Sequence, residues 1–169
     1  SHVAIFGVGG VGGFIAESLA RCGVGKLTLI DCDTVSITNI NRQIIALNST
    51  VGKSKTDVMK NRIADINPNC QVNSLFTLYN SESAESIFEG NFDYVADAID
   101  MVSAKIDLIT RAKSKNIPII SSMGTGNKFH PELLQITDLK KTSYDPLAKV
   151  IRVKLKHINK KIMVVSSLE

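Results

Sequence analysis

The chain has 169 residues, of which 44% are hydrophobic and 21% are charged, and it carries a formal net charge of +4. This length provides one domain with a sizeable core, and the composition excludes an intrinsically disordered chain. No apolar run approaches the length of about 18 residues that spans a bilayer, so the sequence predicts no transmembrane helix. We expect no signal peptide, because the apolar opening runs directly into glycines. We expect a cytoplasmic protein, because the number and spacing of the cysteines fit reduced thiols.

The beginning of the chain has the pattern of a strand, a glycine-rich turn, a helix and a second strand. Val3–Val8 is a continuous apolar run, which is typical of a strand buried on both faces. Val11–Cys22 has apolar residues at helical spacing, and Lys26–Ile30 is the next predicted strand. A GxGGxG turn between such a strand and helix is the setting in which glycines bind a nucleotide.

Helices and strands alternate along the rest of the chain. We expect helices over Lys53–Ile66, Ser81–Phe88 (with Ser81 as its cap), Val102–Lys115 and Pro146–Lys156. We expect strands over Val72–Phe76, Phe92–Ile99, Ile117–Ser121, Leu134–Thr137 and Ile162–Val165. This alternation predicts an α/β fold with a doubly wound, mostly parallel Rossmann-like sheet, helices on both faces and a smaller C-terminal strand–helix–strand extension. We divide the domain into a core, 1–125, and an extension, 126–169, and expect both ends to continue beyond this chain.

The four glycines of the first turn have separate expected roles. Gly7 allows a tight turn, and Gly12 lets the following helix pack close to the strand. Gly9 and Gly10 let the backbone approach a phosphate or ribose, and the helix N-terminus attracts negative charge. The alternative is a plain tight turn without a ligand. The turn therefore indicates a nucleotide without specifying which one.

Two aspartates follow the second strand. Asp31 stands where a carboxylate accepts hydrogen bonds from ribose hydroxyls, and its charge would repel the 2′-phosphate of NADP. The alternative for Asp31 is a solvated loop aspartate. Asp33 has two alternative roles, a contact with a ligand or a cap for the following loop.

A dense polar cluster, Asn39-Ile-Asn41-Arg42-Gln43, comes next. The planar guanidinium of Arg42 suits a triphosphate, and Asn39, Asn41 and Gln43 are candidates to orient it. A domain that binds a dinucleotide for hydride transfer has no use for such a cluster. The cluster therefore favours chemistry at a phosphate.

Two more charged residues are placed to act on phosphates. Lys55 opens a predicted helix, where its ammonium can meet a second phosphate, although an ordinary exposed lysine is the alternative. Asp100 ends the strand Phe92–Ile99 at the rim where open parallel sheets bind ligands, so it is our candidate magnesium ligand. Asp97 is a secondary candidate, and the loop 121–126 on the same rim is expected to shape an acceptor pocket.

Charge is unevenly distributed along the chain. Residues 1–138 have a net charge of −2, whereas residues 139–169 have a net charge of +6. A basic segment beside a slightly acidic nucleotide-binding core favours a polyanionic partner, and the alternative is a solvated helix face.

The cysteines and histidines exclude two other kinds of site. Cys22, Cys32 and Cys70 are odd in number and lack CxxC spacing, which favours reduced, buried structural thiols and argues against zinc. The three histidines stand apart from any serine or cysteine at recognisable spacing, so a hydrolase triad has no support.

The sequence resembles the adenylating-enzyme superfamily of ubiquitin-activating enzymes and molybdopterin- and thiamine-biosynthesis adenylyltransferases. Five motifs carry this resemblance, in this order: the turn Gly7–Gly12, the pair Asp31/Asp33, the segment Asn39–Gln43, Lys55 and Asp100. The C-terminal part is similar to one branch, the tRNA threonylcarbamoyladenosine dehydratases. This likeness is carried by Gln135–Thr142 and by Asp145–Ala148, which is followed by Val150–Arg152 and Leu155–Lys156. The sulfur-carrier-activating branch usually has a CxxC zinc pair near residues 141–145, and this chain lacks one.

The resemblance implies ATP-dependent dehydration of threonylcarbamoyladenosine in tRNA, through adenylation of its carboxylate and release of pyrophosphate. It implies Arg42, Lys55 and Asp100 as catalytic residues, ATP and Mg²⁺ as cofactors, a homodimer, and a sulfur-transfer protein as a candidate partner. One alternative is activation of the C-terminal Gly-Gly carboxylate of a ubiquitin-like sulfur carrier. Two others are an NAD-dependent oxidoreductase and a non-catalytic tRNA-binding module.

Overall fold

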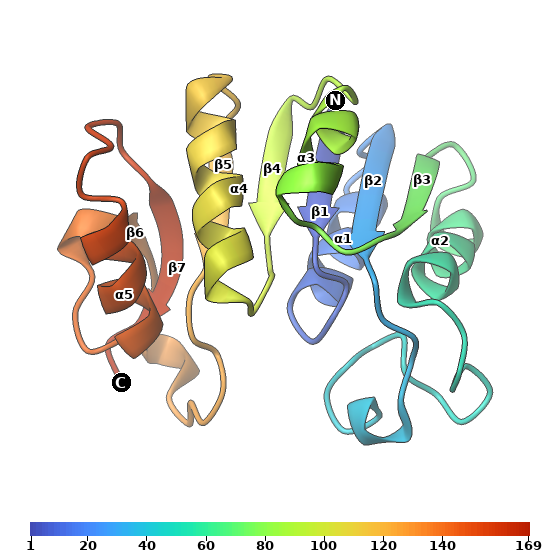
Figure 1. The fold of residues 1–169 in the computed structure, drawn as a ribbon. Helices are drawn as coiled ribbons and strands as arrows, with labels where there is room; N and C mark the ends of the chain where they lie inside the picture. Colours follow the sequence, from blue (N-terminus) through green and yellow to red (C-terminus); the bar gives the residue numbers. More distant parts are fainter. The chain divides into compact units, whose positions relative to one another are not determined.

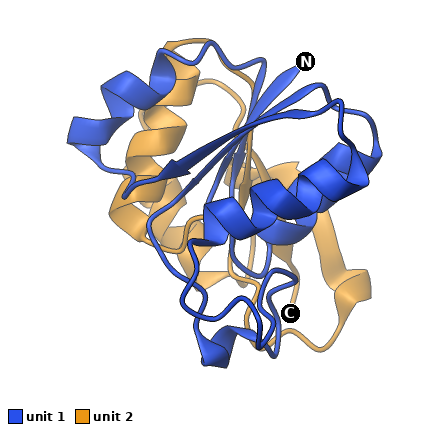
Figure 2. Ribbon diagram, turned by 90° about the vertical axis from the view of Figure 1, so that its right-hand side faces the viewer, with its two compact units in different colours: residues 1–98 blue, residues 99–169 orange.

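The computed structural model describes residues 1–169, which form seven β-strands and five α-helices. The chain divides into two compact units, residues 1–98 and residues 99–169, which Figure 2 shows in different colours. None of its helices has both the length and the apolar character needed to cross a membrane.

The first unit is a parallel four-stranded sheet with helices on both faces. Its strands are β1 (His2–Phe6), β2 (Lys26–Asp31), β3 (Gln71–Phe76) and β4 (Tyr94–Asp97), paired in the order β3-β2-β1-β4. Its helices are α1 (Gly12–Arg21), α2 (Lys55–Ile66) and α3 (Ser81–Phe88). Figure 1 shows α1 and α2 behind this sheet and α3 in front of it. Because the strands are parallel, their carboxyl ends share one edge, where the loop after β2 also lies.

Strand β1 is buried along its whole length, as predicted from its continuous apolar run. Val3 and Ile5 belong to the core cluster that also contains residues of α1 and α2. Phe6 faces the opposite side, where its ring packs edge-on against Tyr79 and stacks on Phe88 of α3. Alternate side chains of one central strand therefore anchor helices on both faces of the sheet.

The second unit contains β5 (Ile119–Ser122), β6 (Leu134–Asp138) and β7 (Met163–Ser167), with helices α4 (Val102–Ser114) and α5 (Pro146–Lys154). Strand β7 pairs in parallel with β5 and antiparallel with β6, so that Ile136 lies opposite Val165. Helix α5 connects β6 to β7. The predicted α/β class, the mostly parallel pairing and the C-terminal strand–helix–strand extension are therefore confirmed.

The cap of α3 and the end of β4 differ from the predictions. Asn80, rather than Ser81, caps α3, because its Oδ1 accepts hydrogen bonds from the backbone N–H groups of Glu82 and Ser83 at 3.0 and 2.9 Å. Strand β4 ends at Asp97 instead of Ile99. The N–H group of Ala98 still donates to the carbonyl of Phe6 at 2.8 Å, but β1 turns away at that point and offers no further partner.

Candidate nucleotide-binding site

The glycine turn leaves β1 through a backbone conformation that favours glycine. Gly7 has φ = +86°, and its N–H group donates to the carbonyl of Ile30 at 2.8 Å. A Cβ at Gly12 would lie 1.7 Å from the carbonyl oxygen of Gly7, which is impossible without moving the backbone. The expected roles of Gly7 in the tight turn and of Gly12 in close packing are thus explained by the geometry of the protein alone.

Gly9 and Gly10 differ from Gly12, because the protein leaves room for a side chain at both positions. A Cβ at Gly9 would lie 3.6 Å from Nε2 of Gln43, and a Cβ at Gly10 would lie 3.6 Å from Cγ of Arg42, both ordinary contact distances. Packing therefore does not require glycine here. Close approach of a ligand to the backbone would require it, as in other phosphate-binding turns.

The N-terminus of α1 follows this turn without a local anionic partner. Its capping residue, Val11, has no side-chain acceptor, and the first turn contains no acidic residue. The backbone N–H groups and the positive end of the helix dipole at this terminus are consequently suited to an external anion.

Asp31 holds the turn in place from the end of β2. Its Oδ2 accepts a hydrogen bond from the N–H group of Val8 at 2.7 Å, and its Oδ1 accepts one from the N–H group of Asp33 at 2.8 Å. Asp31 is therefore a structural residue of the turn, and its contact with a ribose stays a prediction. Each carboxylate oxygen retains a further lone pair, so the residue can still accept from ribose hydroxyls.

Lys55 is buried, which contradicts the alternative of an ordinary exposed lysine. Its ammonium lies 2.7 Å from Oδ2 of Asp33, and its backbone N–H group donates to the carbonyl of Asp33 at 3.1 Å. Asp33 thereby fixes the first residue of α2 to the loop after β2. The ammonium is the charged group that we expect to meet a phosphate.

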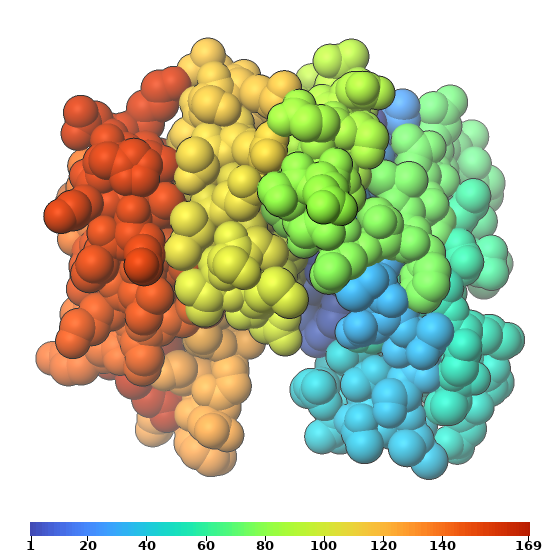
Figure 3. All heavy atoms as spheres, in the orientation of Figure 1, coloured from blue at the N-terminus to red at the C-terminus, as the bar shows by residue number.

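Arg42 is an exposed residue of the loop between β2 and α2, which contains the short 3₁₀ helix Ile37–Asn39. In Figure 3 this loop is the blue and cyan lobe at the lower right. The guanidinium of Arg42 donates from one nitrogen to the carbonyl of Thr38 at 3.1 Å and to Oδ1 of Asn41 at 2.9 Å. Asn41 therefore orients Arg42, as expected, and the remaining N–H groups are available to a ligand.

Asn39 and Gln43 have different surroundings from those we expected. Asn39 completes a capping box: its Oδ1 accepts from the N–H group of Ser36 at 2.9 Å. Gln43 is 7% exposed, and its Oε1 has no hydrogen-bond partner. A buried carbonyl oxygen without a partner is costly, so Oε1 is suited to receive a donor from a ligand. The other amide atom of Gln43, Nε2, is the one that lies beside Gly9.

Asp100 belongs to the second unit, between the end of β4 and the start of α4. Its side chain is exposed and accepts no hydrogen bond. A free carboxylate provides the hard oxygen ligand that Mg²⁺ prefers, so its chemistry fits the predicted metal role. Asp97, in contrast, is buried at 1% exposure.

The cysteines are less buried than expected: Cys70 is buried, but Cys22 and Cys32 are exposed. Sulfur and carboxylate atoms of Asp31, Cys32 and Asp33 lie within 4.8 Å of one another. Burial, followed by the two carboxylates, raises the pKa of the Cys32 thiol, which disfavours the thiolate that a metal would need.

Two features of the site were missing from the sequence interpretation. The carbonyl of Thr38 fixes Arg42, and the N–H group of Val8 is bound by Asp31. Neither contact could be predicted from the residue types, because the Thr38 carbonyl and the Val8 N–H group belong to the backbone. The spacing of Asp31 after the glycine turn was the only available signal for the second contact.

Comparison with known proteins places these features in a family. Residues 1–165 match the sequence profile of the ThiF family. The chain is 52% identical over 171 residues to the tRNA threonylcarbamoyladenosine dehydratase of Bacillus subtilis, covering 100% of this chain and 67% of that protein. It is 33% identical over 121 residues to the molybdopterin-synthase adenylyltransferase of Salmonella typhimurium, covering 72% of this chain and 48% of that protein.

The fold is also similar to that of a solved structure. The crystal structure of the E. coli tRNA N6-threonylcarbamoyladenosine dehydratase, TcdA, in complex with ATP matches with a TM-score of 0.95 and 40% identity, covering 100% of this chain and 73% of that chain. The chain spans 58–67% of the length of the curated bacterial dehydratases that it matches. It belongs to the ThiF family, in the branch of the tRNA threonylcarbamoyladenosine dehydratases.

Proposed function

We propose that this chain is the adenylating part of an enzyme that uses ATP to dehydrate threonylcarbamoyladenosine in tRNA to its cyclic form. The arrangement around the glycine turn supports ATP as the substrate. Arg42, held by Asn41, lies beside Gly10, and the protein leaves space at Gly10 that a phosphate could occupy. Similarity to dehydratases over the whole chain supports tRNA as the second substrate. Similarity to the molybdopterin-synthase adenylyltransferase covers only 72% of it.

The chemistry requires two steps at one carboxylate. The threonyl carboxylate oxygen attacks the α-phosphorus of ATP, the α–β phosphoanhydride bond breaks, and pyrophosphate leaves with the electron pair. A nucleophile of the same nucleoside then attacks the acyl carbon, and AMP leaves. No nucleophile of the protein is needed, so catalysis depends on positioning and on charge stabilisation.

The residues of the first unit supply that positioning. Gly9, Gly10 and the N-terminus of α1 would receive phosphate oxygens, and Asp31 would bind the ribose. Arg42 and Lys55 would neutralise the charge that develops on the phosphates. The uncompensated Oε1 of Gln43 would accept a donor of the nucleotide.

Several finer assignments belong to the same proposal. Asp100 would hold Mg²⁺, which would offset the negative charge of the phosphates. Residues 1–125 would form the adenylation core and residues 126–169 a basic extension of it. We further propose a cytoplasmic homodimer, with a sulfur-transfer protein as candidate partner, because the family resemblance implies these features.

Pyrophosphate release is the direct test. The full-length protein should release pyrophosphate with ATP and tRNA that carries threonylcarbamoyladenosine, and should not do so with tRNA lacking it. Release with a carrier protein ending in Gly-Gly, but not with modified tRNA, would overturn the proposal in favour of sulfur-carrier activation. Tighter binding of NAD than of ATP would overturn it in favour of an oxidoreductase.

Substitutions locate the activity. Arg42→Ala should lower kcat by about 100-fold or more, because it removes a donor that stabilises transition-state charge. The matched control is Arg21→Ala, an exposed arginine of α1 whose bonds are to Glu17. Unchanged pyrophosphate release in Arg42→Ala, with tRNA affinity also unchanged, would contradict the assignment.

The metal assignment has its own test. Asp100→Asn should raise the Mg²⁺ concentration needed for half-maximal activity by about tenfold, because it removes an anionic oxygen ligand. Asp65→Asn, at an exposed position of α2, is the control. Equal Mg²⁺ dependence of both variants would exclude Asp100 as a ligand.

A further inference from the structure

The second unit contains a pocket of about 220 Å³ that lies entirely within residues 138–162. Its floor includes the buried side chains of Leu155 and Ile162. Four cationic side chains line it: Lys140, Arg152, Lys156 and Lys160. They come from four places in the chain: the 3₁₀ helix Leu139–Lys141, helix α5, the segment directly after α5, and the loop before β7. Folding therefore brings these charges around one apolar hollow.

None of these four cations forms an ion pair. The ammonium of Lys160 donates to neutral oxygens, the carbonyl of Lys113 at 3.1 Å and the amide oxygen of Asn116. Arg152 likewise donates to the carbonyl of Thr142, at 2.7 Å. These bonds fix the side chains without cancelling their charge.

One carboxylate, Asp138, lines the pocket with them. Its Oδ1 already accepts a hydrogen bond from the backbone N–H group of Lys140 at 2.9 Å. One negative charge does not balance the four positive charges of the pocket. The pKa of the neighbouring Lys113 is lowered first by burial and then by the charge of Lys160, against an opposing effect of Asp138. The electrostatic environment is thus net positive.

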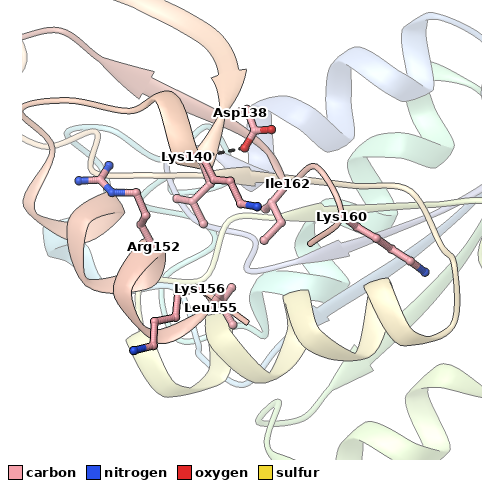
Figure 4. A pocket seen from close by; sticks show the side chains of 8 residues that line it. Asp138, Lys140, Arg152, Leu155, Lys156, Lys160 and Ile162 are labelled. Carbon is pink, nitrogen blue, oxygen red and sulfur yellow. Dashed lines mark hydrogen bonds between the residues drawn. The ribbon is translucent and has the colours of Figure 1, made fainter. Parts of the chain in front are cut away.

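The four charged ends do not converge on one point. In Figure 4, Arg152 and Lys156 extend to the left, Lys160 extends to the right, and the end of Lys140 is drawn between them, beside Ile162. A site for one small anion would direct its donors at a common centre. Cations that spread around a hollow instead suit an anion with several charged groups separated in space.

We propose that this pocket binds consecutive backbone phosphates of the substrate RNA, with a sugar or base against its apolar floor. The choice of RNA as the polyanion rests on the proposed function. The inference that the pocket binds an anion rests only on its cationic side chains. Phosphate contacts by lysine and arginine are the main source of RNA affinity and set the register of the substrate without reading its sequence. The pocket therefore acts in docking the tRNA, separately from the binding of ATP.

Paired substitutions test the location. Lys140→Gln/Lys156→Gln removes the two exposed pocket lysines whose side chains make no hydrogen bond, so the fold should be retained. Lys149→Gln/Lys154→Gln is the matched control, with the same loss of charge from two exposed lysines of α5 outside the pocket. Thermal unfolding of all three full-length proteins checks that the variants remain folded.

The measurements are the KM for modified tRNA, kcat at saturating tRNA, and tRNA affinity as a function of salt. The pocket variant should show a KM about tenfold higher with kcat unchanged, and the slope of log affinity against log salt should fall by about 0.7 to 0.9 for each lost phosphate contact. ATP affinity should be the same in all three proteins. The control should stay within about twofold of the wild type.

Three results would overturn the inference. Equal losses in the two variants would mean that a diffuse basic surface binds RNA, and no loss in either would place the RNA elsewhere. Reduced binding of the pocket variant to phosphatidylserine vesicles, with tRNA binding unchanged, would assign the pocket to a lipid surface. If the wild type binds tRNA through this pocket but releases no pyrophosphate with it, the proposed function fails while this inference stands.

Discussion

Lys55 and Asp33 form an ion pair in which only the cation is buried: the N–O distance is 2.7 Å, and the side chains are 7% and 63% exposed, respectively. The pair connects the loop after β2 to the first residue of α2. A buried ammonium depends on its carboxylate partner, whereas an exposed carboxylate loses little when its partner is removed. The two residues should therefore respond differently to substitution.

Asp33→Asn should lower the free energy of unfolding by about 2 kcal/mol, because it leaves the buried ammonium of Lys55 without a countercharge. Lys55→Met should cost less than about 1 kcal/mol but should abolish pyrophosphate release. Urea unfolding of both variants measures the difference. Equal destabilisation would show that the pair contributes only as a surface interaction.

Gly12→Ala should destabilise the fold by about 3 kcal/mol or more, since its Cβ would collide with the carbonyl of Gly7. Gly10→Ala should leave the melting temperature nearly unchanged and weaken ATP binding by at least about tenfold, because its Cβ has room in the protein but would occupy the space for a phosphate. Thermal unfolding and calorimetric titration with ATP distinguish these outcomes. Normal ATP affinity in Gly10→Ala would exclude close contact at this residue.

Glu17 should make stability depend on pH. Its carboxylate accepts from Arg62 at 2.6 Å and from Arg21 at 2.8 Å, and these two bonds, the one from Arg62 first, lower its pKa below the ordinary value of 4.5. The stabilisation is therefore present above the unfolded-state pKa and is lost as pH falls through the lower folded-state pKa. Glu17→Gln should lose about 1 kcal/mol at pH 7 and progressively less below pH of about 4, measured by urea unfolding. A difference that stays constant with pH would contradict this account.

The cysteines provide a labelling test of the nucleotide site. A thiol reagent should modify exposed Cys22 first, Cys32 more slowly because its pKa is raised, and buried Cys70 only on unfolding. ATP should slow modification of Cys32 by at least about tenfold, because this residue lies between Asp31 and Asp33, and should leave Cys22 unaffected. Mass spectrometry after timed labelling reports each site. Equal protection of Cys22 and Cys32 would indicate a global change in stability instead of local shielding.

Much of the fold could be predicted because it depends on local pattern. The continuous apolar run of β1, the helical spacing of α1 and the order of the motifs are all properties of neighbouring residues. Element ends were predicted less well, since they depend on distant partners. Strand β4 stops at Asp97 because β1 turns away at Gly7, and no feature near Asp97 in the sequence indicates this.

The residue types around the glycine turn were sufficient to indicate phosphate chemistry, because the carboxylate, guanidinium and ammonium that it needs follow one another in a specific order. The burial and the partners of these residues could not be predicted from the sequence. Burial of Lys55 against Asp33, the partnerless Oε1 of Gln43, and the gathering of Lys140, Lys156 and Lys160 around one pocket all arise from contacts between residues distant in the chain. Charge and hydrogen-bonding capacity belong to each residue, whereas desolvation and the field of neighbouring charges exist only once the chain has folded.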